Sequence, residues 1–242
     1  MYTQSAQYYD ALGRALGKDY ANDAATIAQI ALERGNSGGR NLLDVGCGTG
    51  MHIHHLSDRF SCEGLDVNRA MLDIAKARNP GVPFHQTDMI GFNLGKKFDV
   101  ITCLFGSIGY LPSTTRLDQV LQTFARHLKP GGVVIVEPWI TPEQWREGNV
   151  HALFVDEPQL KVARMNVSRR DGNVSILNFH FMVASADGIR TFTEPHRLTL
   201  FTNEQYESAI TRAGLQPDYR ADGLTAGRGL FVGTSARPDN AS

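Results

Sequence analysis

The sequence predicts an α/β fold in which a doubly wound, mostly parallel sheet carries an antiparallel β insertion. Apolar strands alternate with amphipathic helices over residues 1–138, the pattern of a parallel sheet covered on both faces. Acids stand at or just past the ends of several of these strands. Residues 139–200 change to alternating strands, and residues 201–242 add a helix and a strand. We therefore expect a Rossmann-like core, an inserted cap or dimer contact, and a C-terminal segment that completes the core.

The first half of the core reads as strands separated by helices. A helix from Asp23 precedes them, and Gly35 is expected to end it in the left-handed conformation. Three short apolar runs then predict strands, at "NLLDVG" (41–46), "CEGLDV" (62–67) and "PFHQTD" (83–88). Asn68 is expected to cap the helix between the last two, which stops before Asn79 and Pro80.

The second half of the core repeats the pattern. "KFDVITCLFGSIGYL" (97–111) predicts a fourth strand, and apolar residues from Leu117 to Leu128 mark the following helix. Pro130 and Gly131 predict a tight turn before a fifth strand, "VVIVE" (133–137).

The remainder of the chain has its own signals. Asp171 and Gly172 mark a hairpin turn between two strands of the insertion. A helix capped by Thr202 or Asn203 is expected to end at Gly214, and "GRGLFVGTS" (227–235) predicts the last strand. The polar residues 236–242 are expected to be a disordered tail.

Composition excludes several classes of protein. Lys and Arg total 24 against 25 Asp and Glu, a net charge of −1, so no overall positive field is present to bind nucleic acid or an anionic membrane. The chain has neither a signal peptide pattern nor a run long enough to span a bilayer, which predicts a cytoplasmic protein. Cys47, Cys62 and Cys103 are isolated in apolar segments, so we expect neither disulfides nor a cysteine metal site.

The stretch "LLDVGCGTGMHIHHL" (42–56) concentrates the candidate chemistry. Gly46, Gly48 and Gly50 follow a strand, where glycine lets the backbone turn tightly and approach a ligand. Asp44, directly before them, would repel a pyrophosphate but suits a cationic, amine-bearing ligand. Asp66 is placed to accept from both ribose hydroxyls, and Asp88 from an adenine amine. These three groups together describe S-adenosylmethionine.

Two alternatives concern the same stretch. The glycines can serve only a turn, with the acids capping helices. His52 and His55 share a helical face, but no acid or cysteine stands at ligand spacing, so a helix surface is expected rather than a metal site. No metal is predicted.

The motifs resemble a known superfamily. "LLDVGCGTG", "GLDVN", "HQTDM", "FDVITCLFGSIGYL" and "LKPGGVVIVEPW" together are similar to the class I S-adenosylmethionine-dependent methyltransferases, in the family's order. With the reasoning above, the resemblance implies these cofactor contacts: Tyr20, Asp44, Gly46, Cys47, Gly48, Gly50, Asp66, Val67, Met71, Asp88, Met89 and Leu104.

A second resemblance concerns the acceptor and spans nearly the whole chain. "QYYDALGRALGKDYANDA", "GSIGYL", "VVIVEPW", "RDGNVSILNFHFMVA", "PHRLTLF" and "GRGLFVG" look like the N-methyltransferases of nucleotide-linked amino-deoxysugars in antibiotic biosynthesis. It implies a dTDP-3-amino-hexose acceptor, one or two methyl transfers, and a homodimer built through the insertion. Gly13 departs from the family, because several members carry a second tyrosine after "YD".

Candidate residues for the acceptor side follow from their places near strand ends or in the insertion. A sugar amine must lose a proton before it can accept a methyl group, so positioning and proton removal are needed. The catalytic candidates are Tyr9, Tyr110, His180 and His196, and the substrate-binding candidates are Glu137, Trp139 and Arg228. Arg228 is the expected phosphate contact, since a guanidinium suits phosphate oxygens. The alternatives are packing aromatics, half-buried strand histidines and a solvated arginine.

Two other functions remain compatible with these residues. One is a class I methyltransferase acting on another acceptor, by O- or C-methylation of a polyketide or aglycone, or on a tRNA base, which the near-neutral charge disfavours. The other is a cofactor-binding protein without activity, because binding and transfer need different residues.

Overall fold

The computed structural model describes residues 2–236 and contains two sheets, confirming the predicted fold class. The larger sheet has seven strands in the order β10-β11-β5-β4-β1-β2-β3. Its strands are β1 (Asn41–Val45), β2 (Ser61–Asp66), β3 (Phe84–Gln86), β4 (Phe98–Cys103), β5 (Leu128–Val136), β10 (Leu215–Arg220) and β11 (Leu230–Ser235). The five from β5 to β3 are parallel, and β10 and β11 pair antiparallel.

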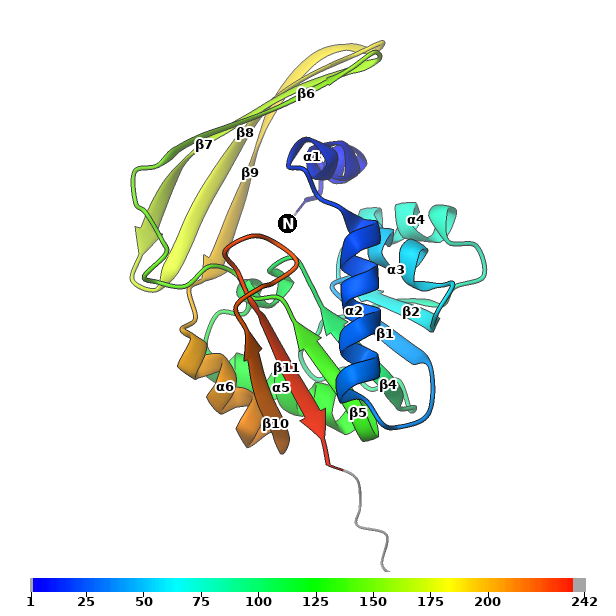
Figure 1. The fold of residues 1–242 in the computed structure, drawn as a ribbon. Coiled ribbons are helices and arrows are strands. Elements are labelled where there is room, and N and C mark those ends of the chain that lie inside the picture. Colours follow the sequence, from blue (N-terminus) through cyan, green and yellow to red (C-terminus); the bar gives the residue numbers. More distant parts are fainter. Residues whose placement is uncertain (1, 237–242) are drawn as a thin grey trace, which may run out of the picture.

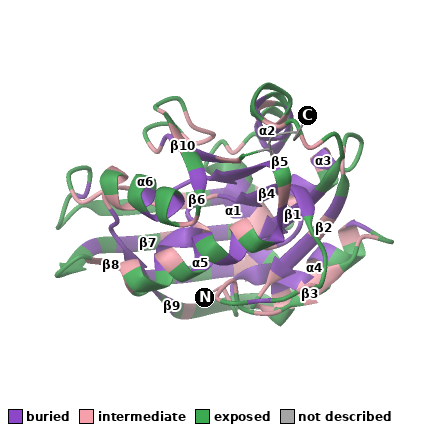
Figure 2. Ribbon diagram, turned by 90° about the horizontal axis from the view of Figure 1, so that it is seen from below, coloured by how far each residue is buried: buried purple, intermediate pink, exposed green. Residues whose placement is uncertain are grey.

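Helices cover both faces of this sheet. They are α2 (Tyr20–Arg34), α3 (Met51–Leu56), α4 (Arg69–Arg78), α5 (Thr114–His127) and α6 (Asn203–Arg212), with a 3-10 turn η2 (Ser107–Tyr110) after β4. Successive residues of a strand point to opposite faces. Leu42 accordingly packs in one cluster with Ile27 of α2, and Leu43 in another with Phe124 of α5. Figure 2 shows that the buried residues concentrate in the strands between these helices.

The order of the strands fixes where a ligand site belongs. The chain runs from β1 outward to β2 and β3, and then returns to β4 on the other side of β1. In open α/β sheets, ligands bind at the carboxyl ends of the strands beside such a reversal. The loops after β1, β2, β3 and β4 all open at this edge.

The second sheet is the predicted insertion. It is antiparallel, in the order β6 (Val150–Glu157), β7 (Leu160–Asp171), β8 (Val174–Ser185), β9 (Gly188–Thr199). It lies across the strand ends of the core, with α1 (Tyr9–Ala15) and the preceding turn η1 (Ala6–Tyr8) beneath its inner face (Figure 1). Leu12 of α1 and Phe179 and Phe181 of β8 belong to the same buried cluster.

Several local predictions are confirmed. Asn68 caps α4, accepting from the backbone N–H of Ala70 at 3.0 Å, and α4 ends at Arg78. Thr202 caps α6 in a reciprocal capping box with Gln205, and Gly214 after this helix has a positive φ of 78°. Gly172 in the β7–β8 turn also has a positive φ.

Other local predictions are wrong. Gly35 is extended, with φ −85° and ψ 139°, because its N–H already closes the last helical turn and the chain leads directly toward β1. The helix predicted from Asp23 is α2, which begins at Tyr20 and is capped by Asp19. Leu128, predicted to lie in a helix, belongs to β5. Pro130 and Gly131 lie within β5, where the pairing with β4 shifts register.

Some elements and residues fall outside the predictions. The strands β6 and β10 and the helix α1 were not predicted. Beyond Ala236, the predicted disordered tail lies outside the described residues. Within residues 2–236, no helix is both long enough and apolar enough to cross a membrane.

Candidate active site

The glycine loop after β1 forms the floor of the site. Gly46 and Gly50 have φ of 71° and 72°, a conformation that residues with a Cβ rarely adopt. A Cβ on Gly46 would lie 2.9 Å from the Cβ of Ser107, and one on Gly50 would lie 2.7 Å from Nδ2 of Asn79. Both glycines are therefore required by backbone conformation and by space. Gly50 is also the N-cap of α3, and Met51 and His52 of the first turn of this helix line a recess beneath the loop.

Asp44 ends β1 below this loop. Its side chain is 1% exposed and accepts a hydrogen bond from Oγ1 of Thr102 at 2.8 Å. Burial raises the pKa of Asp44 to about 6, because the ionised form loses hydration. A cationic ligand group nearby would favour the ionised form. The carboxyl group is therefore suited to the amine-bearing end of a ligand.

Asp66 ends β2 and is held from two sides. Its Oδ2 accepts from the backbone N–H of Gly48 at 2.9 Å, and its Oδ1 from that of Asn68 at 2.8 Å. Burial raises its pKa, while these backbone hydrogen bonds lower it. Each oxygen keeps a free lone pair, so the carboxylate can still accept a bidentate pair of hydroxyl groups.

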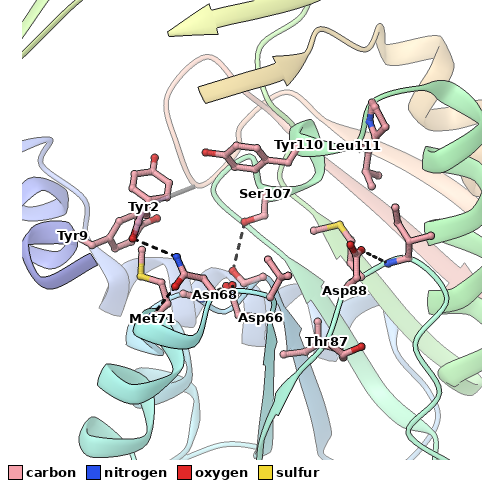
Figure 3. A pocket seen from close by; sticks show the side chains of 17 residues that line it. Tyr2, Tyr9, Asp66, Asn68, Met71, Thr87, Asp88, Ser107, Tyr110 and Leu111 are labelled. Carbon is pink, nitrogen blue, oxygen red and sulfur yellow. Dashed lines mark hydrogen bonds between the residues drawn. The ribbon is translucent and has the colours of Figure 1, made fainter. Parts of the chain in front are cut away.

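Gly46, Gly48 and Asp66 line a cavity of about 230 Å³ (Figure 3). Val67 and Met71 flank Asp66, while Asp88 and Met89 stand at the far end after β3. Asp88 is exposed, and its Oδ1 accepts from the N–H of Ile90 at 2.8 Å. The predicted cofactor residues Asp66, Val67, Met71, Asp88 and Met89 thus lie together.

A narrower recess continues from this cavity under the glycine loop. The predicted cofactor residues Tyr20, Asp44, Cys47 and Leu104 line it, together with Tyr9. The Tyr20 ring stacks edge-on against His52 at 4.9 Å, and its buried hydroxyl has no hydrogen-bond partner within residues 2–236. Burial raises the pKa of Tyr20. The Tyr20 hydroxyl lies against α1, since a Cβ on Gly13 would come within 2.8 Å of its oxygen.

The opposite wall carries the acceptor-side candidates. Tyr9 and Tyr110 both line the cavity, and the Tyr110 hydroxyl lies 2.5 Å from Nδ1 of His196. His196 is 1% exposed, and burial lowers its pKa to about 4. Burial also raises the pKa of Tyr9 and of Tyr110. These three side chains are uncharged at neutral pH.

The structure places His180 away from the cavity. In β8 the side chains alternate between faces, and Phe179 and Phe181 are the buried neighbours that face α1. His180 therefore points to the outer, exposed face, where it contacts Thr193. It does not reach the cavity.

Two of the substrate-binding candidates support other groups instead of lining the cavity. Glu137 is fully buried, and its Oε2 accepts from the N–H of Phe105 at 2.6 Å, holding that residue at a positive φ of 53°. Trp139 donates from Nε1 to Oγ of Ser175 at 3.1 Å. The ring of Trp139 lies 4.5 Å from the guanidinium of Arg228.

Arg228 is the third substrate-binding candidate. Its guanidinium lies 5.2 Å from the Phe105 ring, and its buried Nη1 has no partner among the described residues. Burial lowers its pKa. The sequence signal for it was a cation between two glycines in an otherwise apolar segment.

The histidines after the glycine loop do not form a metal site. His52 Nε2 lies 3.0 Å from the Asp23 carboxylate, which also pairs with Lys18 at 2.8 Å. Asp23 belongs to α2, so the spacing within "MHIHHL" could not predict its contact with His52. In the part of the chain that is described, no group of three or more His, Cys, Asp or Glu side chains is placed to hold a metal ion.

Sequence reasoning missed one prominent cavity residue. Tyr2 packs against Tyr9 at 4.9 Å and against His196 at 4.5 Å, and it lines the cavity (Figure 3). It precedes every helix and strand, so no periodic pattern could have placed it.

Comparisons with known proteins agree with this geometry. A family model described as a methyltransferase domain matches residues 42–132. A Streptomyces fradiae dTDP-3-amino-3,6-dideoxy-alpha-D-glucopyranose N,N-dimethyltransferase is 45% identical over 94% of this chain and 89% of its own length. The crystal structure of Streptomyces venezuelae DesVI has a TM-score of 0.91 at 43% identity and covers 96% of this chain and 98% of its own.

A second similar structure contains the cofactor. S-adenosylmethionine-bound CalS10 is an amino pentose methyltransferase from Micromonospora echinaspora involved in calicheamicin biosynthesis. It has a TM-score of 0.85 at 39% identity, covering 94% of this chain and 96% of its own.

The fold, the glycine loop and the acids at the strand ends define a class I S-adenosylmethionine-dependent methyltransferase. The predicted cofactor, S-adenosylmethionine, is thereby confirmed. Within that class, the chain belongs to the family of dTDP-amino-sugar N-methyltransferases.

Proposed function

We propose that this enzyme methylates the amino group of a dTDP-linked 3-amino-deoxysugar, using Tyr9 and Tyr110 to position the amine. The observation that carries the proposal is the Tyr110–His196 hydrogen bond on the wall opposite the glycine loop. The relative from Streptomyces fradiae, whose name specifies a 3-amino sugar, supports position 3.

The residues of the cavity fit the cofactor in three places. Asp66 would accept from the ribose hydroxyls, Asp88 from the adenine amine, and Asp44 would face the amino-acid end. The unpartnered Tyr20 hydroxyl and the glycine positions that exclude a Cβ are the observations that support this assignment. S-adenosylmethionine, when bound, supplies the methyl group on its sulfonium centre.

The acceptor side favours positioning over general base catalysis. A histidine with a pKa of about 4 is neutral at pH 7 and is too weak a base to keep a proton taken from the amine. Its Nδ1 can accept a hydrogen bond from the Tyr110 hydroxyl, and an incoming amine would then take the place of the Tyr2 phenol beside the Tyr110 oxygen. The phenol can then accept a hydrogen bond from the amine N–H and so orient the lone pair of the amine. Orientation of this kind can contribute strongly to the rate of methyl transfer. The proton released by the amine is expected to leave to water.

Glu137 and Trp139 take supporting roles in this proposal. Glu137 fixes the Phe105 backbone, and the Trp139 ring packs against the Arg228 guanidinium. Arg228 is the residue expected to contact a phosphate group of the nucleotide.

The insertion is proposed to have two roles, with its inner face as a substrate cap and its outer face as a homodimer contact. The outer face exposes large apolar side chains on neighbouring strands, among them Phe154 (61% exposed), Met182 (54%) and Ile189 (74%). Phe154 pairs with Ala163, Ala163 with Met182, and Ala184 with Ile189, so these side chains form one continuous patch. Apolar patches of this kind mark interaction sites. The cytoplasmic location predicted from the sequence remains a prediction.

The acceptor atom separates this proposal from the O- or C-methylation alternative. The enzyme is incubated with S-adenosylmethionine and either a dTDP-3-amino-3,6-dideoxyhexose or the matched dTDP-6-deoxyhexose with a hydroxyl at that carbon. We expect one or two added methyl masses on the amino sugar alone. Methylation of the hydroxyl sugar, or of neither, would contradict the proposal.

A further inference from the structure

The helix α1 lies beneath the insertion and contacts both parts of the enzyme (Figure 1). On the insertion side, Leu12 belongs to the buried cluster that includes Phe179 and Phe181 of β8. Arg14 forms an ion pair with Glu157 of β6 at 2.6 Å, between side chains that are 59% and 40% exposed. An ion pair as exposed as this one contributes little. α1 is therefore attached to the insertion mainly by apolar packing.

On the core side, α1 is held by the carboxylate of Asp10. Its Oδ1 accepts from Oγ1 of Thr49 at 2.6 Å, and its Oδ2 forms an ion pair with Nη2 of Arg78, the last residue of α4. The other terminal nitrogen of this guanidinium, Nη1, donates to the Thr49 carbonyl. Thr49 is 2% exposed and stands between Gly48 and Gly50. We call these three joined residues, Asp10, Thr49 and Arg78, the Asp10 clamp.

The Asp10 clamp differs from an ion pair at the surface. The side chains of Asp10 and Arg78 are only 18% and 23% exposed, so water competes less for their hydrogen bonds. Hydrogen bonds between ionised groups are also stronger than neutral ones. Both carboxylate oxygens are bound, by donors from two different elements, which fixes the carboxylate in position and in orientation. The first turn of α1 therefore has a defined place relative to the glycine loop.

Tyr9 is the cavity residue whose position depends on this attachment. Tyr9 and Asp10 are neighbours in the first turn of α1. The Tyr9 ring lies over the glycine loop, since a Cβ on Gly48 would be 3.9 Å from its Cε1. The same ring lines the cavity and the recess beneath the loop (Figure 3). A shift of α1 would therefore move Tyr9 within the space where cofactor and acceptor must meet.

We propose that Asp10 is a positioning residue for methyl transfer, which acts by holding Tyr9 above the glycine loop. The inference rests on the proposed function, in which Tyr9 helps to position the amine, and adds the Asp10 clamp to it. The glycine loop belongs to the cofactor side and Tyr9 to the acceptor side, so the Asp10 clamp fixes the distance between the methyl group and the amine. A misplacement of about 1 Å between reacting atoms can lower a rate by about 100-fold.

The first test compares Asp10→Ala with Arg14→Met, the matched control, which removes the exposed ion pair of the same helix. Asp10→Ala should lower kcat by about 10- to 100-fold in single-turnover transfer to a dTDP-3-amino sugar. Asp10→Asn keeps an acceptor for Thr49 and should lose less. The dissociation constant of S-adenosylhomocysteine, measured by calorimetry, should change little, because Arg78 still bonds to the Thr49 carbonyl. A kcat of Asp10→Ala equal to that of the control would overturn the proposal.

A double-mutant cycle with Tyr9→Phe distinguishes positioning from a general structural role. If Asp10 acts through the Tyr9 hydroxyl, adding Asp10→Ala to Tyr9→Phe should cost little further rate, so the two effects are non-additive. Thermal unfolding and S-adenosylhomocysteine binding monitor the folding of each variant. Equal losses of kcat in the two backgrounds would show that Asp10 does not act through Tyr9 and would overturn the inference.

A measurement without acceptor separates this inference from the proposed function. S-adenosylhomocysteine should slow amide hydrogen exchange in residues 9–15 of the wild type, because a cofactor-bound glycine loop holds α1 through Asp10. In Asp10→Ala this slowing should be absent, and an equal response in both proteins would overturn the inference. If the exchange difference is found but the wild type does not methylate the amino sugar, the proposed function alone is contradicted.

Discussion

The Tyr110 hydroxyl and Nδ1 of His196 lie 2.5 Å apart, joining the core to the insertion at the wall of the cavity. Tyr110 belongs to the η2 turn after β4, and His196 belongs to β9. His196 is buried and its pKa is low, so in the proposed mechanism it orients the phenol and is not the general base. The sequence presented both residues as catalytic candidates but did not reveal their pairing.

Tyr110→Phe should lower kcat by about 10- to 100-fold, since the amine loses the oxygen that orients it. The dissociation constant of S-adenosylmethionine should change little, because the removed hydroxyl faces the acceptor side. Single-turnover methyl transfer and calorimetry on the same preparation measure the two effects. An unchanged kcat would contradict the proposed role of Tyr110 in orienting the amine.

The pH profile distinguishes positioning from base catalysis. With a His196 pKa of about 4, the acid limb of kcat/KM should follow the ionisation of the sugar amine and should persist in His196→Gln. If the limb moved or vanished in that variant, His196 would be the base.

Asp44 should make cofactor affinity depend on pH. Its pKa of about 6 in the free protein means that it takes up a proton as the pH falls through this value, and the neutral form attracts a cationic ligand less. Affinity should therefore fall by up to tenfold per pH unit below about 6, the linkage limit for one proton. Asp44→Asn should bind weakly with a nearly flat profile. A steep pH dependence in this variant would assign the effect to another group.

The same residue should affect stability in the opposite direction. Folding raises the pKa of Asp44 from 3.8 to about 6, so its contribution is full below pH 3.8 and is lost as the pH rises through 6. At pH 8, ligand-free Asp44→Asn should therefore be more stable than the wild type, by about 1–3 kcal/mol from the linkage relation. Chemical denaturation at pH 5 and pH 8 tests this, and a variant that is less stable at pH 8 would contradict it.

Asp66→Asn should weaken cofactor binding by about tenfold or more, because one oxygen that accepts from the ribose is replaced by a donor. Asp73→Asn is the control, since Asp73 is an exposed acid on the neighbouring helix α4 that pairs with Arg69. Equal losses in the two variants would point to general electrostatics instead of a specific contact.

The outer face of the insertion should control the oligomeric state. Phe154→Glu introduces a charge into the apolar patch and should convert a dimer into monomers without altering cofactor binding. Light scattering across a concentration series measures this. A wild-type protein that stays monomeric at high concentration would contradict the proposed interface.

The parts of the fold that could be predicted were those with strong local patterns. β1, β2, β4 and β5 are buried apolar runs, and Asn68 and Thr202 are strong helix caps. The strand β6 carries apolar side chains on an exposed face, and β10 contains Pro217, so neither showed the expected alternation or apolar run.

The site could be predicted only where one loop or strand end held the residue. Asp44, Asp66 and the glycines follow from the order of strands, whereas the place of Tyr2 depends on how the insertion packs over the core. The outward position of His180 could have been predicted. Leu177, Phe179, Phe181 and Val183 mark the buried face of β8, and this alternation places His180 on the other face.

The measurement that tests the central claim most directly is mass spectrometry of dTDP-3-amino- and dTDP-4-amino-dideoxyhexoses after incubation with the enzyme and S-adenosylmethionine. The account predicts one or two added methyl masses on the 3-amino sugar, located on nitrogen by fragmentation. No mass change on the 3-amino sugar, with cofactor binding intact by calorimetry, would contradict the proposed acceptor. Methylation of the 4-amino sugar alone would contradict the assignment to position 3.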